Sequence, residues 1–87
     1  MKSATLPSFW QNYQVLDDVT KKQARKAYQL WQENPFHPSL HFKCIHAKEK
    51  IWSLRISLNY RALGIFEQDT VTWFWIGNHA EYERFFS

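Results

Sequence analysis

Basic side chains gather around two neighbouring strand-like segments in the second half of the chain. Arg61 lies near the start of segment 60–66 and alternates in phase with its apolar residues. An arginine on such a face either reaches out to solvent or lines a partly dry cleft. Arg55 lies on the polar face of the preceding segment, and a tight turn at Asn59 would bring it near Arg61.

Further groups that can bind phosphate or move a proton lie on either side of these arginines in the sequence. They are Lys43, Lys48 and Lys50 before them, and His79 and Tyr82 after the last strand-like segment. Metal-free RNA cleavage needs a base for the 2′-hydroxyl proton, an acid for the leaving 5′-oxygen, and cations that hold the charge of the phosphorane. The set therefore fits metal-independent cleavage of RNA.

Each member of the set suits one of these tasks. The planar guanidinium of Arg61 can bind phosphate oxygens in pairs and stabilise the transition state. The residues suited to phosphate positioning are Arg55, Lys43, Lys48 and Lys50. His79 can act as an acid or a base, and Tyr82 can stack on a nucleobase. A structural reading stays open, in which Arg55 pairs with a carboxylate on the sheet and His79 caps the final turn.

Other kinds of chemical site find little support. His37 and His41 are four residues apart, but a proline separates them and no HExxH or CxxC motif accompanies them, so we expect no metal. The single cysteine, Cys44, alternates in phase with Leu40 and Phe42, which predicts a buried and inert thiol. Two glycines are too few for a phosphate-binding or dinucleotide loop, so we expect no cofactor.

Length and composition limit the class of protein. At 87 residues the chain is one domain, 1–87, and aromatic residues make up 18% of it, so a small core can still bury a large area. No apolar run approaches the roughly 18 residues of a membrane helix, and the N-terminus lacks the apolar stretch of a signal peptide. We therefore expect a cytoplasmic protein that makes no membrane contact.

The net charge of +3 is unevenly distributed. Segment 21–61 holds nine Lys and Arg residues against two Glu, whereas segment 62–87 is acidic. A basic middle segment favours a polyanionic partner such as nucleic acid, although an ordinary solvated surface has the same composition.

The first half of the chain predicts two helices. A short helix begins at Pro7 with Ser8 as its N-cap. Asp17 or Asp18 caps a second, amphipathic helix over 17–34, which ends where a proline follows Asn34. The stripe of this helix that we expect to be buried contains Ala24, Ala27, Tyr28 and Trp31.

The second half predicts strands and short turns. Alternating or apolar segments fall near 40–44, 52–58, 60–67 and 71–76. The last is apolar on both faces, as in a buried central strand, and residues 79–86 predict a final helical turn from which Tyr82, Phe85 and Phe86 pack back. Residues 3–7 are too short and proline-limited for a strand. The fold class is therefore α+β, with two N-terminal helices on a twisted antiparallel sheet of about four strands.

Two stretches carry a family resemblance, WSLRI…YRALGIF and IGNHAEY. In order and spacing they resemble the toxins of the RelE/ParE type II toxin–antitoxin superfamily, from about Trp10 to the end of the chain. The resemblance implies a compact fold similar to microbial ribonucleases. It also implies cleavage of mRNA in the ribosomal A site, and a cognate antitoxin that wraps the toxin and neutralises it.

The resemblance also implies residue roles. By motif position, Arg61 matches the arginine that stabilises the transition state, and Arg55 matches the preceding arginine of the hairpin. His79 and Tyr82 resemble C-terminal positions that assist proton transfer or stack on the substrate. The residues that approximate the basic loop of the RelE branch are Lys48 and Lys50. Two alternatives stay open, a ParE-like inhibitor of DNA gyrase and an inactive relative that only binds an antitoxin.

Overall fold

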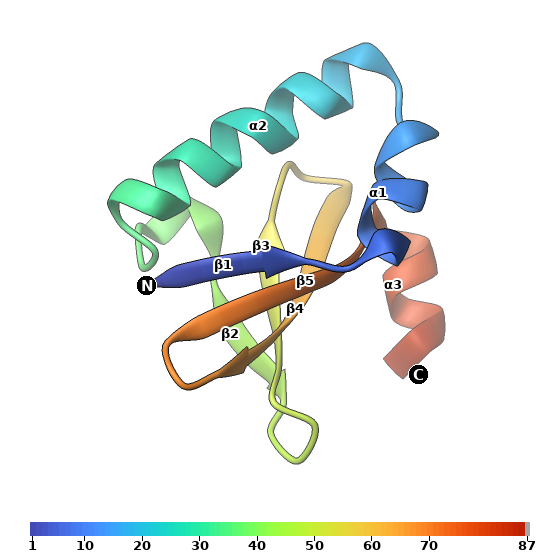
Figure 1. The fold of residues 1–87 in the computed structure, drawn as a ribbon. Helices are drawn as coiled ribbons and strands as arrows, with labels where there is room; N and C mark the ends of the chain where they lie inside the picture. Colours follow the sequence, from blue (N-terminus) through green and yellow to red (C-terminus); the bar gives the residue numbers. More distant parts are fainter. Residues whose placement is uncertain (87) are drawn as a thin grey trace.

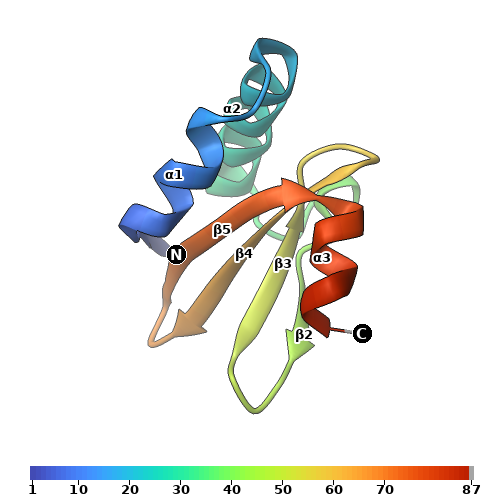
Figure 2. The same ribbon diagram turned by 90° about the vertical axis from the view of Figure 1, so that its right-hand side faces the viewer.

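One twisted sheet forms the centre of the molecule, and helices lie on both sides of it (Figure 1). The computed structural model describes the backbone of residues 1–86 and the side chains of residues 1–84. In chain order its elements are β1 (Lys2–Thr5), α1 (Pro7–Gln14), α2 (Asp18–Glu33), the 3-10 turn η1 (Pro38–Leu40), β2 (Lys43–His46), β3 (Ile51–Arg55), β4 (Tyr60–Glu67), β5 (Thr70–Asn78) and α3 (His79–Phe86). Figure 2 shows α1 and α2 on one side of the sheet and α3 on the other.

The α+β prediction is confirmed, with one strand added. The strand order is β1-β5-β4-β3-β2, and every neighbouring pair is antiparallel except β1 and β5. We did not expect a strand at the N-terminus. β1 has no apolar alternation of its own, and its pairing with β5 is extended by a hydrogen bond from Leu6 N to Trp73 O of 2.9 Å. A short edge strand takes its conformation from its neighbour, so its own sequence carries little signal.

The helices begin and end for reasons that are mostly visible in the sequence. Asp17 caps α2, because its Oδ1 accepts a hydrogen bond of 2.8 Å from Thr20 N, and the helix ends at Glu33, with Asn34, the predicted last residue, as its C-cap. The cap of α1 was predicted wrongly, since Leu6 occupies that position and the Ser8 hydroxyl donates instead to Phe74 O on β5. None of the helices in residues 1–86 is both long and apolar enough to cross a bilayer.

The main core lies between α2 and the sheet. Trp31 is 1% exposed and meets Trp73 and Phe42 edge-on, with ring centroids 5.4 and 5.9 Å apart. The predicted buried stripe of α2 is confirmed, with Tyr28 at its edge packing partly buried against the core. Interlocked aromatic rings therefore form the centre of the core of this small domain.

A bulge lets β5 bury residues on both faces. Leu63 of β4 opposes Trp75 and Gly64 opposes Trp73, so Phe74 is an extra residue on β5. This places Trp73 and Ile76 on the side of α2, while Trp75, which is 6% exposed, faces the side of α3. The prediction of a strand buried on both faces is confirmed.

The beginning of the sheet differs from expectation. Leu40 lies in η1, and β2 begins only at Lys43. Cys44 is exposed rather than buried, although its row partner Trp52 packs against the core. Alternation indicates which face a residue occupies, but β2 is an edge strand whose face is not covered. The predicted packing of Phe85 and Phe86 lies outside the described side chains.

Candidate active site

The two arginines singled out in the sequence lie directly opposite each other on the sheet. β3 and β4 pair Arg55 with Arg61, and β4 and β5 pair Arg61 with Gly77. Opposing residues project to the same face, with Cβ atoms about 5 Å apart. That face is the one on the side of α3, hereafter the α3 face, and Arg55 and Arg61 together form the arginine row.

An aromatic floor lies next to the row. At Gly77, a Cβ atom would overlap the ring of Trp75, so the indole lies against the bare glycine backbone. Trp75 and Leu63, which oppose each other, are both buried beneath this face. The arginines therefore stand beside packed apolar groups and are partly removed from water.

Arg61 is fixed by the turn that precedes it. Its Nη1 donates hydrogen bonds to Ser57 O at 2.8 Å and to Tyr60 O at 3.0 Å, and a longer one of 3.4 Å to Leu58 O. Burial lowers the pKa of Arg61 from its usual value, the charge of Arg55 lowers it further, and Tyr82 raises it. The hydrogen bonds of the Arg61 side chain within the described residues use only Nη1, so Nη2 and Nε remain for an anion.

Among the described residues, Arg55 contacts a histidine and not a carboxylate. Its Nη1 lies 3.2 Å from Nε2 of His41, so the structural alternative with an acidic partner is not what the structure shows. His41 ends η1 in a left-handed backbone conformation, with φ of 45°. From the sequence, His41 was considered only as a metal ligand, together with His37. Continuing the pairing of Lys43 with Ser53 by two residues places His41 opposite Arg55, but this register is known only from the structure.

The other end of the row leads into α3. Asn78 caps this helix by accepting a hydrogen bond of 2.8 Å from Glu81 N, so the cap is not His79. The His79 imidazole stacks on Tyr82, with centroids 5.5 Å apart, and its Nε2 lies 3.0 Å from a carboxylate oxygen of Glu83. The backbone N–H of His79 also donates to Asn59 O in the turn that Arg61 supports.

The lysines lie at different distances from the row. Lys43 opposes Ser53, so it is on the α3 face, two residues along the strands from Arg55. Lys48 and Lys50 lie in the turn between β2 and β3, at the opposite end of β3, and Lys50 forms an exposed ion pair of 3.5 Å with Glu67. At about 3.3 Å per strand residue, the length of β3 separates these two lysines from the row.

The residues of the structure show no metal site. In the described part of the chain, no group of three or more His, Cys, Asp or Glu side chains is placed to hold an ion. His37 instead caps η1, where its Nδ1 accepts a hydrogen bond of 3.2 Å from Ser39 N.

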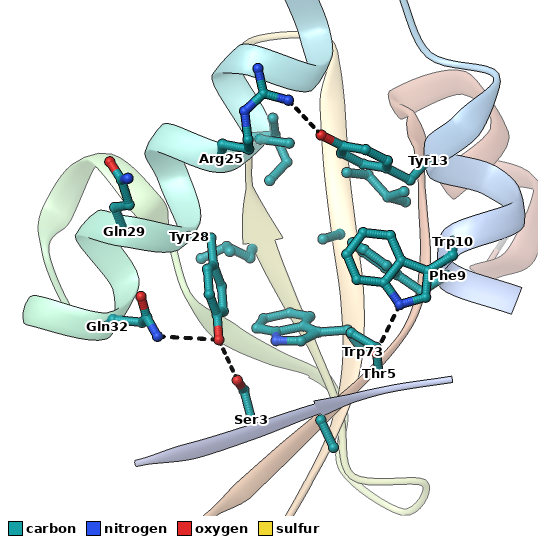
Figure 3. A pocket seen from close by; sticks show the side chains of 16 residues that line it. Ser3, Thr5, Phe9, Trp10, Tyr13, Arg25, Tyr28, Gln29, Gln32 and Trp73 are labelled. Atoms are coloured by element: carbon teal, nitrogen blue, oxygen red, sulfur yellow. Dashed lines mark hydrogen bonds between the residues drawn. The ribbon is translucent and has the colours of Figure 1, made fainter. Parts of the chain in front are cut away.

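A cavity of about 610 Å³ lies on the opposite side of the sheet, between α1, α2 and β1. Its floor includes Trp73, and its rims are bridged by hydrogen bonds from Arg25 to Tyr13 (2.8 Å) and from Trp10 to Thr5 (2.9 Å) (Figure 3). Among the described residues, no carboxylate or histidine lines it. This cavity, hereafter the helix groove, is lined mainly by apolar and aromatic side chains and is thus suited to apolar contact.

Comparison with known proteins agrees with this geometry. The family model of the ParE-like toxin domain matches residues 18–84. The fold is similar to RelE in the RelB–RelE antitoxin–toxin complex of Methanococcus jannaschii (TM-score 0.76, 14% identity, 97% of this chain and 99% of that one). It is also similar to YafQ of E. coli, with a TM-score of 0.74 and 8% identity over 93% of this chain and 96% of that one. A YoeB/ParE toxin of Agrobacterium tumefaciens has a TM-score of 0.68 and 18% identity over 91% of this chain and 99% of that one. No curated protein matches the chain.

The structural neighbours share the fold over nearly the whole chain, and the family model covers most of the same residues, including the arginine row, His79 and Tyr82. The chain therefore belongs to the family of ParE-like toxin domains and is a toxin of the RelE/ParE superfamily.

Proposed function

We propose that the protein is a metal-independent endoribonuclease that cleaves mRNA on the ribosome and so inhibits translation. The observation that carries the proposal is the arginine row, with His41 against Arg55 and His79 two residues beyond Gly77, the residue that opposes Arg61. Like charges placed directly opposite each other on a sheet destabilise it, and a bound phosphate would relieve that repulsion.

The proposed roles follow from position. The free edge of Arg61 and the guanidinium of Arg55 would hold the scissile phosphate and the charge that develops on it. Tyr82 would stack on a base beside His79, and Lys43 would bind a neighbouring phosphate. Lys48 and Lys50 would bind phosphates further along the RNA. The ribosome would position the mRNA, so a domain of this size needs few groups of its own.

We also propose a cognate antitoxin as partner and the cytoplasm as location. Structures of archaeal RelE with RelB show that neighbours of the same fold form such complexes. On this chain, the helix groove offers the antitoxin an apolar surface, with Trp10 47% exposed at its edge and the basic residues of α2 beside it. Trp10→Ala should therefore weaken antitoxin binding, measured by calorimetry, without slowing RNA cleavage.

Inhibition of DNA gyrase is a second candidate, because the matching family model is named for ParE. A gyrase inhibitor that acts by contact would not need the arginine row.

Expression in cells without the antitoxin separates the two candidates. The endoribonuclease proposal predicts arrest of translation, with cuts in ribosome-bound mRNA, and loss of both effects in Arg61→Lys. That variant keeps the charge and a donor for the turn carbonyls but lacks the planar fork. Growth arrest with intact mRNA and a DNA-damage response would overturn the proposal in favour of gyrase.

A further inference from the structure

His41 lies next to Arg55 at the outer end of the arginine row, and the residues on either side of it fix its backbone. Leu40 and Phe42 are buried, at 2% and 7% exposure. The backbone N–H of His41 donates to Pro38 O at 3.3 Å, and its φ of 45° is left-handed. Residues other than glycine adopt this conformation uncommonly, and they keep it where the surrounding structure holds them. The fold therefore sets the point from which the imidazole reaches Arg55.

In the free protein, His41 accepts a hydrogen bond from the row. Its Nε2 lies 3.2 Å from Arg55 Nη1, and a guanidinium only donates. This Nε2 therefore holds a lone pair, and the proton of the neutral ring is on Nδ1. Because the two nitrogens are this close, a phosphate group bound by Arg55 Nη1 would also lie against His41 Nε2.

The charged groups that neighbour His41 on the α3 face are cations. Arg55 lies beside it on β3, Lys43 follows two residues later on β2, and Arg61 opposes Arg55 on β4. In the described part of the chain, no carboxylate forms an ion pair with any of these four side chains. The negative charge that would favour a protonated His41 is therefore left for a ligand to supply.

The other imidazoles near the site have partners of their own. On η1, His37 Nδ1 lies 2.8 Å from Ser39 Oγ. On α3, which packs against β4 and β5, His79 Nε2 lies 3.0 Å from a carboxylate oxygen of Glu83. His41 is thus the imidazole whose partner, a guanidinium, a bound phosphate would take away.

We propose that His41 is a third ligand of the phosphate that the row binds, and that its Nε2 takes up a proton on binding; this assignment rests on the phosphate binding of the proposed function. Phosphate forms stronger, charge-assisted hydrogen bonds with Arg55 than a neutral imidazole does, so the Arg55 donors turn to the phosphate. The lone pair of His41 Nε2 is then left against an anion. A proton from solvent converts that nitrogen into a donor, which a histidine permits near neutral pH.

Binding of the proton and binding of the phosphate therefore strengthen each other. Because such coupling is reciprocal, phosphate binding tightens as the pH falls, by roughly 5- to 150-fold for a typical coupling free energy. The two arginines alone would bind phosphate equally well across the neutral range, since a guanidinium keeps its proton there. The pH dependence of binding thus reports on the imidazole.

The test uses the intact protein and a thymidine dinucleotide, with binding followed by NMR. The single phosphodiester of this probe keeps its charge across the neutral range, and the probe lacks the 2′-hydroxyl, so it binds without being cleaved. The dissociation constant of the wild type should be about tenfold lower at about pH 5.5 than at about pH 7.5. At constant pH, the nitrogen signal of His41 Nε2 should change from that of an unprotonated atom to that of a protonated one as the dinucleotide is added.

His41→Asn should bind the dinucleotide with the same affinity at both pH values, within about twofold. Asparagine tolerates the left-handed backbone and accepts from Arg55, but it does not titrate. His46→Asn is the matched control, since this histidine lies at the far end of β2 beside Ile51, and it should keep the tenfold change. His79→Gln should keep that change too.

An unprotonated His41 Nε2 at saturation with the dinucleotide would overturn the assignment. A pH dependence that survives in His41→Asn, or that is lost instead in His79→Gln, would overturn it too, as would a wild type that binds no dinucleotide at either pH. Affinity that does not vary with pH, in a protein that cleaves mRNA on programmed ribosomes, would overturn the assignment and leave the proposed function intact. The expected pH dependence without mRNA cleavage would overturn the endoribonuclease activity and leave His41 as a phosphate ligand.

Discussion

The two faces of the sheet differ in the side chains that they carry, aromatic rings on one and a pair of arginines on the other. On the side of α2, Trp31, Trp73 and Phe42 interlock, and no charged side chain belongs to this core. On the α3 face, Arg55 stands against Arg61, where desolvation and repulsion both disfavour the charge of Arg61. A fold that needed only stability would not place these two cations together. Under the proposed function, the α2 side supplies stability and the α3 face supplies phosphate chemistry, and the predictions below test that division.

The largest expected effect is on the stability of the α2 side. Trp31→Ala should lower the free energy of unfolding by about 3–5 kcal/mol, because it removes a fully buried ring from the aromatic cluster. Urea titration followed by circular dichroism would measure it. Trp31→Phe is the milder control, and it loses no hydrogen bond within the described residues, where Trp31 Nε1 has no partner. A loss below 1 kcal/mol in Trp31→Ala would refute the stabilising role of this face.

Alanine substitutions at the two glycines of the sheet allow a direct comparison of the two faces. A Cβ at Gly77 would overlap the Trp75 ring beside Arg61, and one at Gly64 would meet Val71 Cγ1 at 2.5 Å and Trp73 Cε3 at 2.9 Å. Each Ala substitution should cost about 1–3 kcal/mol, since a packed ring must shift. Only Gly77→Ala should also weaken phosphate binding, measured as the rise of Tm with added phosphate. Equal loss of phosphate binding in both variants would contradict the division between the faces.

A smaller effect is expected when the repulsion in the row is removed. Arg55→Gln should leave the free energy of unfolding unchanged within about 0.5 kcal/mol, or raise it, because Arg61 loses a like-charged neighbour. The rise of Tm that phosphate produces in the wild type should shrink in this variant. If Arg55→Gln unfolds more easily and still gains the full stabilisation from phosphate, the arginine row is structural.

The most local effect concerns Asp17, the N-cap of α2, which lies away from both faces. Hydrogen bonds from the side chain and backbone of Thr20 to the Asp17 carboxylate lower the pKa of Asp17 from the usual 3.8. The contribution to stability is therefore present above pH 3.8 and is lost as the pH falls through the lower folded-state pKa. Asp17→Ala should reduce Tm by a few degrees at pH 7, and the difference from wild type should disappear in strong acid. In Asp17→Asn, which keeps an acceptor without titrating, the cap should persist at low pH.

Much of this division could be predicted from sequence, because it follows from periodicity. The buried stripe of α2 follows from helical spacing, and the meeting of Arg55 with Arg61 follows from alternation and a short turn. The residues that sequence missed depend on pairing between strands. His41 joins the site only through the register of β2 against β3, and β1 exists only through its pairing with β5. Exposure at an edge, which decides the environment of Cys44, is likewise set by tertiary structure.

The central claim is that the arginine row binds and cleaves RNA, and cleavage by purified protein on programmed ribosomes tests it most directly. The wild type should produce fragments with 2′,3′-cyclic phosphate ends. Arg61→Lys should slow their formation by about 100- to 1,000-fold, with unchanged binding to the antitoxin as proof of folding. Intact mRNA with the wild type, or equal rates for the two proteins, would contradict the account.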